Sequence, residues 1–134
     1  MTFTPYLHFQ GDCAEALAFY AEVFGTDAPE ISRYSDAPEG SGLPAGEGVM
    51  HGEIRLGDAV LMASDFPPGI GDPQAAVSVM HSVADPETGR AIFEALAVEG
   101  GAIVEPWSET FFARGFGMVR DRFGTHWIIH AGHP

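Results

Sequence analysis

Two segments of the chain place apolar residues at helical spacing, and both are punctuated in a similar way. The first follows Gly11-Asp12 and ends before Gly25. Its apolar face is formed by Cys13, Ala16, Leu17, Tyr20, Val23 and Phe24. Asp12 suits the N-cap position, and Glu15 three residues later completes a box-like start. This pattern predicts a helix over 13–24.

The second segment opens at Asp85-Pro86, an N-cap residue followed by proline at the first helical position. It runs to Gly100, and one of its faces carries Ile92, Phe93, Leu96 and Ala97. The pattern predicts a second helix over 86–99.

Short runs with strand character surround both predicted helices in the same order, one before each helix and three after it. They cover 6–9, 30–34, 49–56, 59–64, 77–83, 102–106, 111–120 and 126–131. This repeat predicts an α+β fold made of two tandem βαβββ modules. Module one covers 1–65, a proline-rich linker covers 66–74 and module two covers 75–134, so that 1–134 forms one domain. The Gly-, Pro- and Glu-rich segment 35–48 is either a solvated loop or a lid over a cavity.

Strand parity predicts which side chains of module one face away from its helix, because alternate residues of a strand share a face. Leu7 and Phe9 suit the helix side of the first strand, which leaves Tyr6, His8 and Gln10 on the other side.

The dipeptide Gly57-Asp58 forms a two-residue hairpin turn between the third and fourth strand-like runs. Counting outwards from this turn pairs Leu56 with Ala59, Ile54 with Leu61, Glu53 with Met62, Gly52 with Ala63 and His51 with Ser64. Ile54 and Leu61 suit the helix side. The remaining inward positions are His51, Glu53, Met62 and Ser64.

The same parity argument applied to module two places Val77, Val79, Val83, Trp127 and Ile129 on the helix side. The inward set is then Ser78, Met80, Ser82, His126, Ile128 and His130. His81 falls on the helix side and is interpreted as a core histidine. Arg114 lies among Trp107, Phe111, Phe112 and Phe116, which form either an aromatic mouth around a ligand anion or a packing surface for the other module or a second subunit.

Composition removes several classes of function. The 134 residues include 19 acidic side chains and six basic ones, all arginine, for a net charge of −13, and there is no Lys or Asn. The chain therefore has no lysine nucleophile and no P-loop, and its charge disfavours nucleic acid and anionic membranes as partners. The single cysteine, Cys13, excludes multi-cysteine metal sites. No apolar run has the length of a membrane span, and a cytoplasmic location is expected.

Three stretches carry a resemblance to a known group: PYLHFQGDCAEALAFYAEVFG at 5–25, VMHGEIRLGDAVLMASD at 49–65 and FARGFGMVRDRFGTHWII at 112–129. Together with the module order they resemble the vicinal oxygen chelate superfamily, which includes glyoxalase I, bleomycin resistance proteins and extradiol dioxygenases. The resemblance is closest to the PhnB-like branch. It implies curved sheets around a cavity, helices on the convex side, and pairing of two chains as a homodimer.

In superfamily members that use a metal, four inward side chains hold it, and the metal acts as a Lewis acid. The matching positions here are Tyr6 (or Pro5, depending on one gap), Met62, Ser78 and Ile128. None of them is His, Asp or Glu, so no cofactor is expected at the usual site. A divalent metal shifted to His8, His51 and Glu53 is an open alternative.

Three functional hypotheses follow from these residues and the resemblance. The first is a PhnB-like protein that binds a small molecule in its cavity without the usual metal ligands. The second is a metal-dependent lyase or dioxygenase with the shifted His/Glu site. The third is a protein that sequesters an antibiotic, as the bleomycin-binding relatives do.

Overall fold

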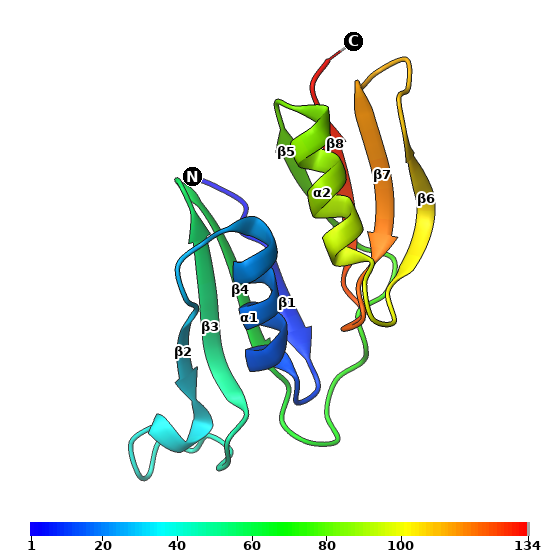
Figure 1. Cartoon of the computed structure of the whole chain (residues 1–134). Helices are drawn as coiled ribbons and strands as arrows, with labels where there is room; N and C mark the ends of the chain where they lie inside the picture. The colour runs from blue at the N-terminus through cyan, green and yellow to red at the C-terminus, as the bar shows by residue number, and fades with distance from the viewer. Residues whose placement is uncertain (134) are drawn as a thin grey trace. The chain divides into compact units, whose positions relative to one another are not determined.

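Each half of the chain folds as one strand, one helix and three further strands (Figure 1). The computed structural model describes residues 1–133. The first half contains β1 (Tyr6–Phe9), α1 (Cys13–Phe24), β2 (Glu30–Arg33), the 3₁₀ turn η1 (Tyr34–Asp36), β3 (Val49–Leu56) and β4 (Ala59–Asp65). The second contains β5 (Ser78–Val83), α2 (Pro86–Leu96), β6 (Ala102–Ser108), β7 (Gly115–Arg120) and β8 (His126–Ala131). The halves form two compact units, and the boundary between them along the chain falls between Gln74 and Ala75.

The strands of each unit form a mixed four-stranded sheet, with the order β1-β4-β3-β2 in sheet one and β5-β8-β7-β6 in sheet two. In both sheets the first strand runs parallel to the last strand of its unit, and the other pairs are antiparallel. The predicted α+β class and the βαβββ order are confirmed. The hairpin register is also confirmed, with Glu53 opposite Met62 and Ile54 opposite Leu61.

One helix lies across one face of each sheet, and a glycine in the third strand of each unit makes room for it (Figure 1). A Cβ atom on Gly52 of β3 would lie 2.6 Å from Leu17 Cδ1 of α1. A Cβ atom on Gly117 of β7 would lie 2.5 Å from Phe93 Cε1 of α2. Close approach of helix and sheet therefore depends on glycine at these two strand positions.

The start of α1 departs from the sequence prediction. Asp12 occupies the N-cap position, but its side chain makes no capping hydrogen bond. The buried carboxylate of Asp65, at the end of β4, accepts hydrogen bonds from the backbone N–H groups of Gly11 (2.8 Å) and Cys13 (3.1 Å) through Oδ1. Its Oδ2 accepts a third from Val49 (2.9 Å). A residue distant in sequence thus satisfies the first backbone donors of the helix and ties it to the sheet.

In the second unit a local residue caps α2, as predicted. The side chain of Asp85 accepts a hydrogen bond from the backbone N–H of Thr88. The predicted end is wrong, because α2 stops at Leu96, and Glu99 and Gly100 both have positive φ. The prediction extended the helix through 97–99, where Val98 is apolar but exposed.

The segment 111–114 was predicted as strand and is a turn, so β7 begins only at Gly115. The hydroxyl of Thr110 accepts hydrogen bonds from the backbone N–H groups of Phe112 and Ala113. These bonds compete with strand pairing, as threonine hydroxyls often do in turns.

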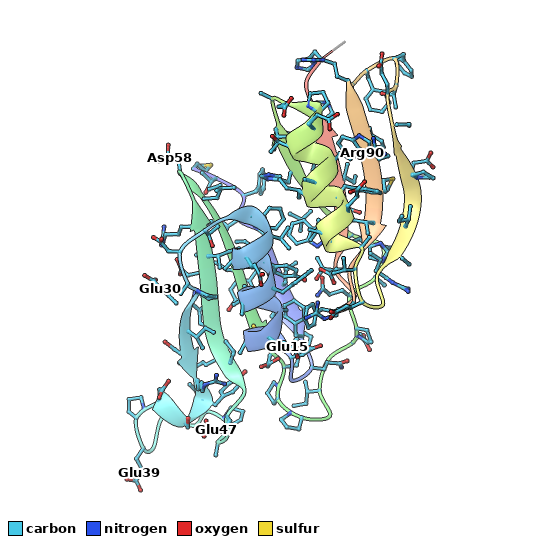
Figure 2. The ribbon with its side chains drawn as sticks, in the orientation of Figure 1. Glu15, Glu30, Glu39, Glu47, Asp58 and Arg90 are labelled. Atoms are coloured by element: carbon cyan, nitrogen blue, oxygen red, sulfur yellow. The ribbon has the colours of Figure 1, made fainter. Side chains whose placement is uncertain are left out.

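The acidic side chains of the first unit lie largely on its surface. Figure 2 shows Glu15 on α1, Glu30 on β2, Glu39 and Glu47 in the loop after η1, and Asp58 at the β3–β4 turn, and all five are exposed. Within the part of the chain that the structure describes, no helix is long and apolar enough to cross a membrane.

Candidate functional site

The face of sheet one that lies away from α1 carries the polar side chains that parity assigned to it. On β1, Leu7 and Phe9 are buried beneath the helix, whereas Tyr6 and His8 are exposed. The pairing of β1 with β4 and of β4 with β3 brings the predicted inward residues of module one onto this common face. They are Tyr6, His8, His51, Glu53, Met62 and Ser64.

Three of these residues form a continuous hydrogen-bonded chain, which we call the Tyr6–His51–Glu53 chain. Tyr6 Oη lies 2.9 Å from His51 Nδ1, and His51 Nε2 lies 3.1 Å from Glu53 Oε1. Tyr6 and His51 stand on β1 and β3 with β4 between them, so the tyrosine side chain spans an intervening strand to reach the histidine. The long phenol ring makes this possible, since neighbouring strands are only about 4.8 Å apart.

The glutamate at the end of this chain is held as a carboxylate. The hydrogen bond from His51 lowers the pKa of Glu53, and the nearby Arg55 guanidinium lowers it further. Arg55 Nη2 lies 2.6 Å from Glu53 Oε2, and the glutamate side chain is 12 % exposed. Glu53 therefore acts only as a hydrogen-bond acceptor in this site.

His8 and Ser64 form a second polar pair beside the chain. Ser64 Oγ lies 3.1 Å from His8 Nδ1, and the His8 ring stacks on Phe66 with centroids 4.4 Å apart. The Tyr6 ring is tilted against His8 at 5.2 Å. Tyr6, His8 and Phe66 thus form a row of neighbouring rings beside the chain.

The equivalent face of sheet two carries the inward residues predicted for module two. Ser78 pairs with His126, Met80 with Ile128 and Ser82 with His130, while Trp127 and Ile129 are buried on the helix side. Met80 is 54 % exposed, so this face presents apolar surface. Nδ1 of His130 is buried and has no hydrogen-bond partner within residues 1–133.

His81 lies on the helix side of β5, as predicted, and is half-buried. Burial lowers the pKa of its imidazole below the ordinary value of 6.5. The neutral ring is therefore the form that the fold favours.

The aromatic residues around Arg114 separate into two groups. Trp107 packs on Phe93 of α2, where Gly89 and Gly115 leave room for its indole, so it belongs to the core of its own unit. Phe111, Phe112 and Phe116 form a run of edge-to-face contacts, with centroids 5.1 and 5.0 Å apart. Arg114 is exposed, and its charge lowers the pKa of Asp85 after the stronger effect of the Thr88 hydrogen bonds.

The positions that the resemblance to the vicinal oxygen chelate superfamily assigns to metal ligands carry none of the usual ligand side chains here. Tyr6 and Met62 pair with each other in sheet one, and Ser78 and Ile128 lie in sheet two. A phenol, a thioether, a hydroxyl and an alkyl chain do not form a usual divalent site. Among residues 1–133, no group of three or more His, Cys, Asp or Glu side chains is arranged to hold a metal ion. In the alternative site, both ring nitrogens of His51 already have partners, Tyr6 and Glu53.

Sequence reasoning missed a cavity of about 440 Å³ in the first unit. Its walls come from the loop 44–48 and from 65–70, with Arg33 and Tyr34 between them. The Arg33 guanidinium donates a hydrogen bond to the Glu47 carbonyl (2.6 Å), which fixes the loop. The only sequence signal for this cavity was the Gly- and Pro-rich loop itself, which was interpreted as either a lid or solvated chain.

Comparison with known proteins identifies relatives that match nearly the whole chain. The family described as 3-demethylubiquinone-9 3-methyltransferase matches residues 1–130. Protein YjdN of Escherichia coli (strain K12) is 29 % identical over 140 residues, which cover 97 % of this chain and 95 % of YjdN.

Solved structures agree with this match. The crystal structure of protein PA1353 from Pseudomonas aeruginosa has a TM-score of 0.89 at 33 % identity, covering 100 % of this chain and 99 % of that one. A PhnB protein from Bacillus cereus, described as a 3-demethylubiquinone-9 3-methyltransferase, has a TM-score of 0.75 at 26 % identity, with 98 % and 100 % covered. A glyoxalase/bleomycin resistance protein from Albidiferax ferrireducens T118 shares the fold, with a TM-score of 0.63 at 12 % identity and coverage of 95 % and 96 %.

Proposed function

Because the chain belongs to the family described as 3-demethylubiquinone-9 3-methyltransferase, a PhnB-like family with the glyoxalase/bleomycin-resistance fold, we propose that it binds a small molecule on the sheet faces opposite its helices. The observation that carries this proposal is the Tyr6–His51–Glu53 chain. It connects polar groups across three strands yet leaves Tyr6 41 % exposed. Polar groups that converge on an accessible face are typical of ligand sites.

The composition of the face of sheet one supports a ligand with both a polar and a flat apolar part. This face offers the hydroxyl and imidazole groups of Tyr6 and His8, and the His8 ring stacks on Phe66. The equivalent face of sheet two, taken by itself, offers exposed Met80. The proposal is one of binding, not of the methyl transfer that the family's description names, because these side chains support contacts with a ligand.

The test uses the full chain and a panel of neutral aromatic, phenolic and cationic compounds in a thermal-shift assay. A true ligand at 100 times its dissociation constant adds about 2.7 kcal/mol to stability and raises the melting temperature. Tyr6→Phe and His51→Ala should weaken that shift. Glu15→Gln, on the exposed face of α1, should leave it unchanged (Figure 2). Equal shifts in all variants would contradict a site on this face.

The proposal includes binding without a resident metal, because the residues at the usual positions do not fit one. Elemental analysis of protein purified without chelator should find no stoichiometric divalent metal. A full equivalent of metal that His51→Ala removes would contradict this part of the proposal.

We also propose that the chain forms a homodimer. Each four-stranded sheet ends in two edge strands, β1 and β2 in sheet one and β5 and β6 in sheet two. Proteins commonly cover such edges because their free N–H and C=O groups pair with other chains. Light scattering should give twice the chain mass of 14.3 kDa, and a monomer mass would overturn the proposal.

A further inference from the structure

We propose that the Tyr6–His51–Glu53 chain makes the Tyr6 hydroxyl a hydrogen-bond acceptor, so that the site selects a planar ligand with an acidic O–H group, a phenol or an enol, and takes up its proton. This inference rests on the proposed function, because it names the ligand class of the same sheet face. It follows from the direction in which the hydrogen bonds must run.

The ionised Glu53 fixes which atoms donate in the two hydrogen bonds. Glu53 is ionised beside Arg55 and accepts only, so the proton on the His51–Glu53 hydrogen bond belongs to Nε2 of His51. A neutral imidazole with its proton on Nε2 has an acceptor at Nδ1. The contact of 2.9 Å between Tyr6 Oη and His51 Nδ1 is then a hydrogen bond that the tyrosine hydroxyl donates.

This direction decides which hydrogen-bonding capacity of the Tyr6 hydroxyl is left for a ligand. Its single donor is engaged by His51, so the exposed hydroxyl presents only oxygen lone pairs. A carboxylate, phosphate or ketone gains no hydrogen bond from it, whereas an O–H group does. The His8 ring, which is tilted against Tyr6 and stacks on Phe66, favours a planar ligand.

A ligand with an acidic O–H group can also transfer its proton along this hydrogen bond. Its proton moves to Tyr6 Oη as the tyrosine's own proton moves to His51 Nδ1. The ligand O–H bond and the original Tyr6 O–H bond break, while a new Tyr6 O–H bond and an Nδ1–H bond form. The products are a ligand anion and a His51 imidazolium, which Glu53 stabilises from the other side.

The other ionisable groups around the Tyr6–His51–Glu53 chain are not placed to accept the tyrosine proton. His8 on β1 is paired with Ser64, Arg55 on β3 is paired with Glu53, and Glu30 on β2 lies opposite Glu53. The neighbouring β4 side chains on this face, Met62 and Ser64, do not ionise in the working range. His51 is therefore the proton acceptor within hydrogen-bonding reach of the tyrosine.

The first experiment needs no ligand. Nitrogen-15 NMR of the full chain near neutral pH distinguishes the two neutral tautomers of His51. We expect the tautomer protonated on Nε2. In the tautomer protonated on Nδ1, His51 would donate to Tyr6 Oη and leave the tyrosine proton free for a ligand. Finding that tautomer would overturn the inference, whether or not the face binds small molecules.

The second experiment uses 4-nitrophenol, whose phenolate absorbs visible light, and 4-nitroanisole, which lacks the proton. At a pH below the pKa of the free phenol, the wild-type chain should generate the phenolate band and bind nitrophenol at least tenfold more tightly than nitroanisole. Tyr6→Phe and Glu53→Gln should lose the band. Glu30→Gln, a matched loss of one carboxylate on the next strand, should keep it.

Equal affinity for the two probes, or a phenolate band that persists in Tyr6→Phe, would overturn the inference while leaving small-molecule binding intact. If other panel compounds bound to this face and nitrophenol did not, the proposed ligand class would be wrong and the proposed binding function would stand. Failure of every compound in the panel would instead contradict the proposed function.

Discussion

The buried carboxylate of Asp65 holds the start of α1, the end of β4 and the start of β3 together, and its isosteric replacement by asparagine tests this role. The side-chain amide keeps one acceptor oxygen and replaces the other with a donor. If the oxygen stays with Gly11 and Cys13, the N–H of Val49, which is fully buried, loses its acceptor. An unsatisfied buried donor costs about 1–3 kcal/mol, and two hydrogen bonds lose their charge assistance. Burying a neutral amide costs less than burying a carboxylate, which offsets part of this loss. We therefore expect a net decrease of about 2–4 kcal/mol in the free energy of unfolding.

The chain provides a built-in assay for the first unit, because Cys13 is its only thiol and is 0 % exposed. A thiol reagent labels it only when this region opens. At 1.4 kcal/mol for each factor of ten, Asp65→Asn should accelerate labelling by about 30- to 700-fold. Trp107 and Trp127 both lie in the second unit, so tryptophan fluorescence should show that unit unchanged.

Asp12→Asn is the matched control, because it removes the carboxylate that local sequence rules assign as the cap. The Asp12 side chain makes no capping hydrogen bond, so labelling should change by less than about threefold, within the usual effect of a surface substitution. The reasoning would be refuted if Asp65→Asn labelled at the wild-type rate, or if Asp12→Asn accelerated labelling as much as Asp65→Asn.

Three further predictions test packing and protonation. Gly117→Ala places a Cβ against the rigid Phe93 ring and should destabilise the second unit by about 1–3 kcal/mol in fluorescence-detected denaturation, more than Gly52→Ala affects the first. Burial raises the pKa of Cys13 to about 12, with smaller contributions from Asp65 and Asp12, so the folded thiol should resist labelling at pH 8 and react in denaturant. The lowered pKa of His81 means that the second unit should lose stability as pH falls below 6.5, and His81→Gln should flatten that dependence.

Much of the fold could be predicted from the sequence because its signals are local. Alternation along β1 and the Gly57-Asp58 turn set which side chains share a face and how β3 pairs with β4, and both predictions agree with the strand pairing. Asp85 and Pro86 marked the start of α2 for the same reason, since an N-cap acts within one helical turn.

The errors arise where distant residues or competing local bonds decide the structure. Asp12 has the sequence of a cap, but Asp65 arrives from β4 and takes the backbone donors of α1. The Thr110 hydroxyl takes backbone donors in the segment 111–114, which otherwise has the composition of a strand. Neither outcome is visible in periodicity, because periodicity records burial and not the partners of individual N–H groups.

In the candidate site, too, local sequence signals predicted which face the side chains occupy but not the contacts between distant residues. Parity places Tyr6, His51 and Glu53 on one face, but it does not show that the tyrosine spans β4 to meet the histidine. That contact depends on the parallel register that sets Tyr6 beside Met62, and no local signal encodes this register. The cavity lined by Arg33 was missed because it joins the loop 44–48 to the segment 65–70, and strands β3 and β4 lie between them in the chain.

The geometry of sheet one relates the missing metal ligands to the chemistry that is present. Tyr6 and Met62 occupy two of the positions that the superfamily resemblance assigns to metal ligands. They stand side by side, and neither is a carboxylate or an imidazole. The acidic and imidazole groups, Glu53 and His51, stand on β3 and are engaged with each other and with Tyr6. A Lewis acid would withdraw electron density from a ligand oxygen, whereas the proton transfer that we propose for the Tyr6–His51–Glu53 chain would remove a proton from one. Both arrangements stabilise a ligand oxyanion, and we propose that sheet one does so through protein side chains alone.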